Sequence, residues 1–521
     1  MNIMMNPSAY WLATSLFALL AFAPLQDQGA VKPEKGRQEM ASETKVRQAA
    51  VAGSFYPADP KILSTMMDGF LARVSGPPVT DPILAVVAPH AGYEYSGPVA
   101  AYTYAALKGH KYTRVVIIAP SHYVAFDYTS IYDGDAYATP LGNVPVDKAF
   151  ARELVKMSST MQLSDKGHQA TSDAPEHSVE VQLPWLQKIL GNFELVPIVM
   201  GDTSYESSRA LGVALAKMLR DDHNTLVLAS SDLSHYHPYD DAVKIDHKTL
   251  NALQAWDYFS MSRNFQWRGP GQPGIWEACG GAPIVATMIY AERMGANQAR
   301  VLKYANSGDT TGNHSRVVGY SADVFIKADN GKAAETPFSL TEEEKSELLA
   351  LARKSVEYVV QERYPYEPPA STSSSLNQER GAFTTLKEAG ELRGCIGYTS
   401  AVKPLYITVR DTATLAATQD PRFPQVTASE LPKLEYEISV LSPLRRVTDV
   451  QQIKVGQHGL LMKNGDSEGI LLPQVPVEQQ WDRQTFLEQT CRKAGMRSDC
   501  WMDENTDIFS FTAVVFGEHK P

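Results

Sequence analysis

The chain has 521 residues, of which 44% are hydrophobic and 21% are charged, as is ordinary for a globular protein. At roughly 150 residues per domain, this length predicts two to four domains. The net charge of -11 argues against a nucleic acid as the main partner, because binding a phosphate backbone needs a surplus of Lys and Arg. Four cysteines are too few for a disulfide framework.

The N-terminus carries an apolar stretch without charges, residues 10–25, which is short for a membrane span and is followed by polar residues. We therefore predict a signal peptide over residues 1–30, export to the periplasm or the extracellular medium, and no stable membrane span after cleavage. The stretch before residue 10 has no Lys or Arg, and Pro24 follows an Ala-x-Ala-like sequence. An uncleaved membrane anchor therefore remains the alternative. Residues 31–45 are polar and predict a linker.

Three short, continuous, apolar runs dominate the first predicted domain, residues 46–328. Runs of this kind are typical of strands that are buried on both faces, as in a parallel sheet covered by helices. Each run ends in a polar residue, namely His90, His122 or Asp232, and open α/β sheets bind their ligands at this carboxyl edge. The runs are Ile83–His90, Arg114–Tyr123 and Thr225–Asp232.

Helical and extended patterns alternate through the same region, which predicts an α/β domain with a mostly parallel sheet flanked by helices. Ser96 and Gly97 precede Pro98 and predict a helix start at this point. Further helices are predicted over 61–74, 178–190, 207–219 and 282–294, and further strands over 193–201 and 317–325.

A second linker, residues 329–338, precedes a second predicted domain, residues 339–517. This domain opens with a capping box, Thr341 and Glu344, in front of an amphipathic stretch. Short alternating strands follow, with a hairpin around Asn464-Gly465. They predict an α+β domain with an antiparallel sheet. A helix over 478–494 and a last strand over 508–516 complete the prediction.

Imidazole chemistry belongs to the first domain, because ten of the twelve histidines lie between His90 and His314. Two histidines and one anionic ligand, with coordination positions left open, hold non-haem iron. Cys279 lies in a glycine-flanked turn before a predicted helix, where backbone amides favour a thiolate. The competing interpretation is structural: His90 and His122 as hydrogen-bonded strand ends, and Cys279 as a small buried residue.

Five motifs in register, PHAGYEYSG, APSHY, EHSVEVQLPWL, SSDLSHY and EACGG, closely resemble the MEMO family. The fold of that family is similar to that of the class III extradiol dioxygenases of the LigB type. The resemblance implies that His90, His122 and Cys279 are metal ligands and that the metal is Fe²⁺. Those dioxygenases have a glutamate as third ligand, and because thiolate softness also suits copper, copper is the alternative here.

The other motif residues receive acid-base or supporting roles. The resemblance places His235 where the dioxygenases keep their general acid-base group, and the unperturbed pKa of histidine suits that role. Asp232, three residues away, would orient an imidazole or the metal. His177 and Glu180 are predicted to share a helix face. Purely structural roles for His235, Asp232 and His177 remain the alternative.

In the second domain, ELRGCIG, LLPQV and WDRQTFLEQTCRKAG strongly resemble the AMMECR family. This resemblance implies a fold and a suspected site rather than a reaction. In one interpretation, Arg393 and Cys395 line a cleft. In the other, which we favour, Cys395 is a core residue beside the glycines of a tight turn. Proteins of the two families occur in prokaryotes together with a radical-SAM protein, which is thus an expected partner. Cys491 and Cys500, the pair nearest in sequence, would bridge in an oxidising compartment.

These observations predict an exported, metal-dependent redox enzyme that acts on a small molecule or peptide, with an accessory domain that binds substrate or a partner. Two alternatives use the same residues. One is a non-catalytic metal- or ligand-binding module. The other is a hydrolase with Cys279 as nucleophile, His122 or His235 as base and Asp232 as the orienting group.

Overall fold

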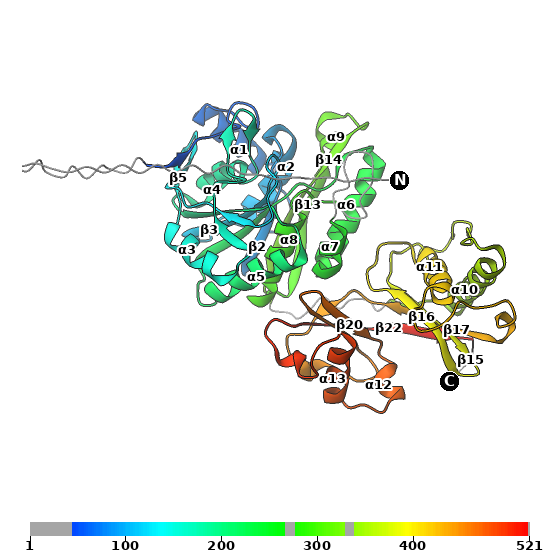
Figure 1. Ribbon diagram of the computed structural model, residues 1–521. Helices are drawn as coiled ribbons and strands as arrows, with labels where there is room; N and C mark the ends of the chain where they lie inside the picture. The colour runs from blue at the N-terminus through cyan, green and yellow to red at the C-terminus, as the bar shows by residue number, and fades with distance from the viewer. Residues whose placement is uncertain (1–43, 266–276, 329–337, 519–521) are drawn as a thin grey trace, which may run out of the picture. The chain divides into compact units, whose positions relative to one another are not determined.

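The computed structural model describes residues 44–265, 277–328 and 338–518 (Figure 1). The predicted signal peptide, nearly all of the linker 31–45 and most of the linker 329–338 lie outside these residues. Residues 44–521 form one compact unit. No helix within the described ranges is long and apolar enough to cross a membrane.

A nine-stranded sheet forms the centre of the first domain. Its middle consists of four adjacent parallel strands, which confirms the predicted α/β class. Alternate side chains of these strands enter two different apolar cores, as Val115 and Ile117 on one face and Val116 and Ile118 on the other show. The four strands, in sheet order, are β2 (Ile83–Ala88), β11 (Thr225–Ser230), β3 (Arg114–Pro120) and β10 (Glu194–Met200).

Both edges of this sheet turn antiparallel. At one edge, β14 (Val317–Ile326) runs antiparallel to β2 and pairs with two further strands. These are β12 (His235–His237) and β13 (Gln298–Asn306). At the other edge, β4 (Thr129–Ile131) pairs antiparallel with β10 and parallel with β7 (Met161–Leu163).

Helices cover both faces of the sheet (Figure 1). One face carries α1 (Pro60–Leu71), α2 (Tyr93–Ala106) and α4 (Leu183–Leu190). The other carries α3 (Lys148–Leu154), α5 (Tyr205–Met218), α6 (Tyr239–Gln254), α7 (Tyr258–Asn264) and α8 (Gly281–Arg293). Smaller elements include β1 (Val46–Arg47), β5 (Ala136–Thr139), β6 (Gly142–Pro145) and α9 (Ser307–Thr311).

Two predicted helix starts are wrong. Helix α2 begins at Tyr93 and contains Pro98 in its interior. Because Pro98 has no N–H, the Glu94 carbonyl lacks its helical hydrogen bond. Glu94 is exposed, so this carbonyl can bind water. The predicted helix over 178–190 begins as a 3₁₀ turn, η2 (Glu180–Gln182), so α4 starts only at Leu183.

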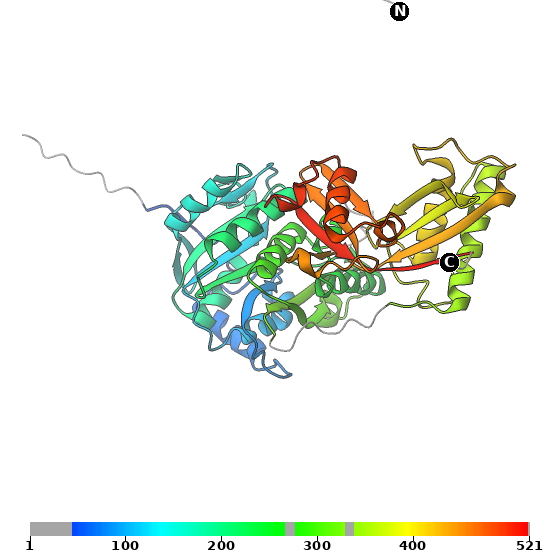
Figure 2. The ribbon, with the colours of Figure 1, turned by 90° about the horizontal axis from the view of Figure 1, so that it is seen from below.

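The second domain contains two antiparallel four-stranded sheets, as Figure 2 shows in yellow to red, which confirms the predicted α+β class. The first has the order β16 (Glu391–Tyr398), β15 (Ala382–Glu388), β17 (Leu434–Leu441) and β22 (Ala513–Gly517). Helices α10 (Glu342–Glu362), with the predicted capping box, and α11 (Leu405–Thr418) pack on it. The second has the order β18 (Arg445–Arg446), β21 (Asp507–Phe511), β19 (Gly459–Asn464) and β20 (Ser467–Leu471).

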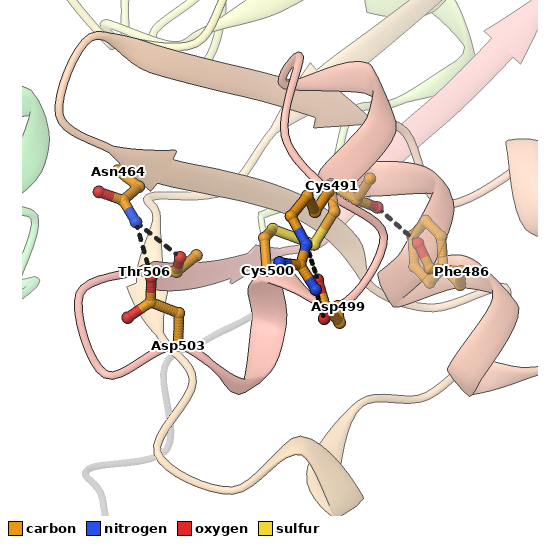
Figure 3. Close-up of a disulfide and its surroundings, with 9 residues drawn as sticks. Asn464, Phe486, Cys491, Asp499, Cys500, Asp503 and Thr506 are labelled. Carbon is orange, nitrogen blue, oxygen red and sulfur yellow. Dashed lines mark hydrogen bonds and ion pairs between the residues drawn. A yellow bond between two sulfur atoms is a disulfide. The ribbon is translucent and has the colours of Figure 1, made fainter.

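Two elements predicted as continuous are divided in the structure. The helix predicted over 478–494 is split into α12 (Val475–Glu478) and α13 (Arg483–Lys493), with Gln480 between them in a left-handed conformation at φ 56°. The strand predicted over 508–516 is split at Thr512 into β21 and β22, which serve different sheets. A disulfide joins Cys491 and Cys500 (Figure 3).

Candidate metal centre

The carboxyl edge of the parallel sheet gathers the predicted side chains. His90 follows β2, Asp232 follows β11 and His122 follows β3, and these three strands are neighbours in the sheet. Cys279, which directly precedes α8, lies against the same edge, because its amide donates to the Asp232 carbonyl at 3.2 Å. Four segments far apart in sequence therefore build one site.

His90 is held in one tautomer by its neighbours. The Ser230 hydroxyl donates its single proton to the Ser178 carbonyl, so it can only accept from His90 Nδ1, 2.9 Å away. His90 Nε2 is then left with a lone pair, and it lies 3.1 Å from Cys279 Sγ. The imidazole is buried, which together with the charge of His122 lowers its pKa well below the usual value. His90 is therefore neutral and suited to bind a metal ion.

His122 is anchored by a carboxylate. Its Nδ1 donates to Glu176 Oε1 at 2.9 Å and its backbone amide donates to Oε2 at 2.7 Å. Although burial opposes the shift, hydrogen bonds with Cys279 and Glu176 raise the pKa of His122 to about 10. The same ion pair overcomes burial and lowers the pKa of Glu176 to about 2. A quarter of the His122 side chain is accessible, so a ligand can reach it.

Cys279 is packed tightly against the end of β11. The Asp232 amide donates to Cys279 Sγ at 3.3 Å. The next residue, Gly280, has to be a glycine, because an added Cβ would collide with the Ser230 carbonyl and with the Ser231 side chain. Burial raises the pKa of the Cys279 thiol despite its hydrogen bond with His122. A bound cation would reverse this shift, since metal binding replaces the thiol proton.

Asp232 is a buried carboxylate without a Lys or Arg partner among the described residues. It accepts hydrogen bonds from the amides of His90 at 2.8 Å and Ala91 at 3.3 Å, and its Oδ2 lies 4.0 Å from His90 Nε2. Burial raises its pKa. An ionised carboxylate is costly to bury, so this environment favours the binding of a cation.

His177 stacks on His122, with ring centroids 4.6 Å apart and planes inclined by 7°. The Phe55 ring also packs against His177, with ring centroids 4.5 Å apart. The His122 and His177 rings lie in parallel, separate planes, so one ion cannot lie in both ring planes. His177 is also buried, which lowers its pKa to about 4, and its Nδ1 has no hydrogen-bond partner. It would therefore lie beside a metal held by His122, as a neutral base.

His235 lies at the rim of the site and is half buried. Its Nδ1 donates to the Leu233 carbonyl at 2.9 Å, which leaves Nε2 as an acceptor. His235 interacts electrostatically with both His90 and Asp232, so it lies near them. The next residue, Tyr236, has a left-handed backbone at φ 64° and an exposed ring. His235 is placed to exchange a proton with solvent.

Donor atoms lie within 4.8 Å of one another in two groups of three residues, both of which include His90. One group adds His122 and His177, and the other adds Asp232 and Cys279. The hydrogen bond between Cys279 and His122 links the two groups. The predicted set of His90, His122 and Cys279 is thus divided between the two groups and joined by this contact, and two imidazoles with a thiolate would suit iron or copper.

Sequence reasoning did not identify Glu176, Ser230 and Phe55 as parts of the site. Glu176 and Ser230 fix the ring orientations of His122 and His90, and Phe55 covers His177. Phe55 is fixed because its carbonyl accepts from the Tyr93 amide. Glu180, predicted to share a face with His177, instead accepts from Arg47 and Tyr56. The one available indication was Glu176 beside His177 in the EHS motif.

Cys395 in the second domain has no imidazole among its described contacts. Thr385 donates to its Sγ at 3.3 Å, and its amide donates to Asp420 Oδ2 at 2.8 Å. Burial raises the pKa of its thiol. Gly394 beside it is required, because an added Cβ would collide with the Ala416 carbonyl. Arg393 pairs with Glu430 at 2.7 Å. These contacts agree with the structural interpretation of this motif.

Comparisons with known proteins cover both domains. The family described as Memo-like protein matches residues 47–324, and the family described as AMMECR1 matches residues 349–516. A MEMO1 family protein from Methanopyrus kandleri is 40% identical over 292 residues, covering 54% of this chain and 98% of the relative. One from Sulfolobus acidocaldarius is 37% identical over 289 residues, covering 53% of this chain and 97% of the relative.

Among solved structures, an uncharacterized protein from Pyrococcus horikoshii is similar at 39% identity, covering 35% of this chain and 95% of its own, with a TM-score of 0.34. The family matches cover the five motifs of the first domain and the three of the second. The chain therefore belongs to the Memo-like protein family and carries an AMMECR1 domain after its Memo-like domain.

Proposed function

We propose that this protein is a metal-dependent redox enzyme whose ion is held by His90, His122 and Cys279. The observation that carries the proposal is the convergence of Cys279 Sγ on both imidazoles, at 3.1 Å from His90 Nε2 and in hydrogen-bond contact with His122. The buried carboxylate of Asp232, without a Lys or Arg partner among the described residues, supports the same proposal.

Iron as Fe²⁺ is the proposed metal, and copper is the alternative. Two histidines with one anionic ligand suit Fe²⁺, whereas the softness of a thiolate suits copper. Either ion, when bound, supplies a Lewis acid and a one-electron redox couple with coordination positions left for a substrate. The accessible edge of His122 indicates the side from which a small molecule or peptide enters.

The protein's own groups then have distinct tasks. Glu176 keeps His122 oriented through Nδ1, and Ser230 does the same for His90. His235 moves a proton through Nε2, because its Nδ1 is occupied by the Leu233 carbonyl. His177 accepts a hydrogen bond or a proton from the substrate, since its buried Nδ1 has no other partner. Asp232 balances the positive charge of the ion.

Metal analysis and turnover of single variants test the proposal. His90→Ala is expected to lose the metal and any turnover together. His235→Ala is expected to keep the metal and lose turnover, measured as oxygen consumption with Fe²⁺ and candidate catechols. Wild-type metal content in both variants would refute the ligand set. Retained metal without turnover of any substrate would favour a metal-carrying module.

A hydrolase with Cys279 as nucleophile is the other candidate from the same residues. Such an enzyme needs an accessible thiolate, whereas burial raises the pKa of this thiol. Metal-free protein in which Cys279 is alkylated rapidly at neutral pH would favour the hydrolase.

We also propose that the protein is exported and carries its disulfide in an oxidising compartment. The apolar stretch over residues 10–25 and the Cys491–Cys500 disulfide support this location. Sequencing the N-terminus of the mature protein from its native host tests it. A radical-SAM protein is the proposed macromolecular partner, and co-purification of the two from that host is the test.

A further inference from the structure

The sheet of β18, β21, β19 and β20 has two apolar faces. Leu460, Met462 and Ile508 on one face pack against α13 and the disulfide within the same lobe. Leu461, Phe509 and Phe511 on the other face belong to the core that contains α7 and α8 of the first domain. The Phe509 ring contacts the rings of Tyr258 and Phe259, with centroids 6.1 and 5.0 Å away. We call residues 445–511 the disulfide lobe.

A buried charge cluster lies beside this apolar contact. Asp507, the first residue of β21, is 2% exposed. It accepts from Tyr205 OH at 2.8 Å and from Arg209 on α5, and it lies 3.3 Å from Arg293 on α8. Arg446 of the lobe lies 3.5 Å from the same carboxylate. Since breaking a buried ion pair is strongly destabilising, these contacts hold the lobe against α5 and α8.

Helix α8 connects this contact to the candidate metal centre. It begins at Gly281, two residues after Cys279, and ends at Arg293, about 20 Å away at 1.5 Å per residue. All its residues from Gly281 to Ala291 are buried, so it can shift only as a rigid unit. Its start is also tightly packed, because an added Cβ on Gly281 would collide with the Phe265 ring. A change at Arg293 is therefore transmitted to Cys279.

We infer that the disulfide lobe is a positioning element for the metal centre, and that Asp507, by holding Arg293 and Arg209, sets the place of the Cys279 ligand through α8. The inference rests on the proposed metal site and extends it to the second domain. It assigns the AMMECR1 domain a role in metal binding although none of the proposed metal ligands belongs to that domain.

The lobe also holds Asp507 itself in place. The Cys491–Cys500 disulfide ties the segment before β21 to the end of α13 (Figure 3). Two residues between Cys500 and Asp507 are held by Asn464 of β19. The side-chain amide of Asn464 donates to Thr506 Oγ1 at 3.1 Å and lies 3.4 Å from Asp503 Oδ2 (Figure 3). The turn that leads from Cys500 to Asp507 is thus held in place at both ends.

The first test uses Co²⁺ as a probe in the full chain, because its thiolate charge-transfer band reports the cysteine ligand. Asp507→Asn and Phe509→Ala are each expected to weaken Co²⁺ binding at least tenfold and to reduce or shift this band. Asp499→Asn is the matched control, since Asp499 is an exposed lobe residue paired only with the exposed Arg497. It is expected to leave both readouts unchanged within twofold. An unchanged affinity and band in both test variants would overturn the inference.

The second test needs no variant and covers the case in which these substitutions unfold the lobe. Coupling between docking and metal binding is reciprocal, so metal must stabilise the docked lobe as much as docking stabilises the metal. Hydrogen exchange of the β21 amides in the wild-type chain is therefore expected to slow severalfold when Co²⁺ is added. Equal exchange with and without bound Co²⁺ would overturn the inference.

The two levels of the proposal fail differently. If His90→Ala retains the metal, the ligand set itself is wrong. If His90→Ala loses the metal while the Asp507 and Phe509 variants bind it like wild type, only the positioning role of the lobe is wrong.

Discussion

Each domain places a half-buried cysteine beside a buried aspartate, and the two pairs have opposite electrostatics. In the second domain, Asp420 holds the Cys395 amide and is paired with Arg422 at 2.6 Å. The hydrogen bond from Arg422 lowers the pKa of Asp420 to about 2, in spite of burial. In the first domain, Asp232 exchanges backbone hydrogen bonds with Cys279 and has no such cation among the described residues.

The difference separates a structural cysteine motif from the proposed metal-binding one. Arg422 already neutralises the charge of Asp420 beside Cys395, and the Cys395 amide already donates to Asp420. The Cys395 region therefore gains nothing from an added cation. The Cys279 region carries two imidazoles and a buried carboxylate without a Lys or Arg partner among the described residues, so it is suited to an added cation. The following predictions test this contrast, beginning with the largest expected effect.

Replacing the two cysteines separately should give the largest difference. Cys279→Ser is expected to weaken Fe²⁺ or Cu⁺ binding by at least about 100-fold, more than a supporting residue would, since a serine hydroxyl is a poor ligand for these ions. Cys395→Ser should leave metal affinity unchanged. Competition titration with a chelator measures both. Equal losses in the two variants would remove the distinction between the two regions.

Glu176→Gln should have the next largest effect. It removes the charge that orients His122 and should weaken metal binding by about 10- to 100-fold. The pH profile of metal binding should also change. The Glu176 carboxylate helps to raise the pKa of His122 to about 10, so in the variant His122 should exchange its proton for the metal at lower pH. Glu153→Gln, on an exposed pair with Lys156, is the control. Wild-type affinity in Glu176→Gln would contradict the orienting role.

The two aspartates should respond to neutralisation with opposite signs in the metal-free protein. The pKa of Asp420 is lowered in the folded state, so its stabilisation is present above pH 4 and lost as pH falls towards 2. Asp420→Asn should therefore destabilise the protein at pH 7 by about 2 kcal/mol. The pKa of Asp232 is raised, so its ionisation destabilises the fold as pH rises above about 4. Asp232→Asn should stabilise the metal-free protein at pH 7.

Urea unfolding of both variants between pH 3 and 7 measures these changes. Shifts of the same sign would show that the two carboxylates have similar surroundings after all. Added metal should reverse the sign for Asp232→Asn alone, because only this carboxylate balances the charge of the ion.

The smallest predicted effect concerns Thr385. Its hydroxyl donates to Cys395 Sγ and opposes the effect of burial on the pKa of this thiol. Thr385→Val should raise that pKa further and slow alkylation of Cys395 at pH 8 a few-fold, as expected for losing one hydrogen bond. Mass spectrometry of the labelled peptide gives the rate, with Cys279 as internal reference. Faster alkylation in the variant would contradict this account.

Much of the site could be anticipated because its residues follow features that are local in sequence. The runs that end at His90, His122 and Asp232 are continuous and apolar, and buried parallel strands require such runs. Their polar ends therefore had to meet at one edge. Local rules were weaker for helix boundaries: Pro98 favours a helix start by composition, but it lies inside α2, since packing outweighed its preference.

The partners of the ligands depended on tertiary structure. Glu176 is 54 residues from His122, and Ser230 is 140 residues from His90, so no local pattern links either pair. The contact of Asp507 with Tyr205 joins residues 302 positions apart. Such pairs form only after the sheet and its helices have packed, and their charges are interpretable only in their buried surroundings.

The buried parallel strands, the order of the two domains and the identity of the imidazoles and the thiol at the edge of the sheet could be predicted from the sequence alone. This was possible because burial of a strand and the chemistry of a side chain are properties of short segments. Three features depended on the folded chain: which nitrogen of His90 faces Cys279, the lack of a Lys or Arg partner for Asp232 among the described residues, and the link that α8 makes between Cys279 and Asp507. These are relations between distant segments, and hydrogen-bond geometry and electrostatics are set by distances in space.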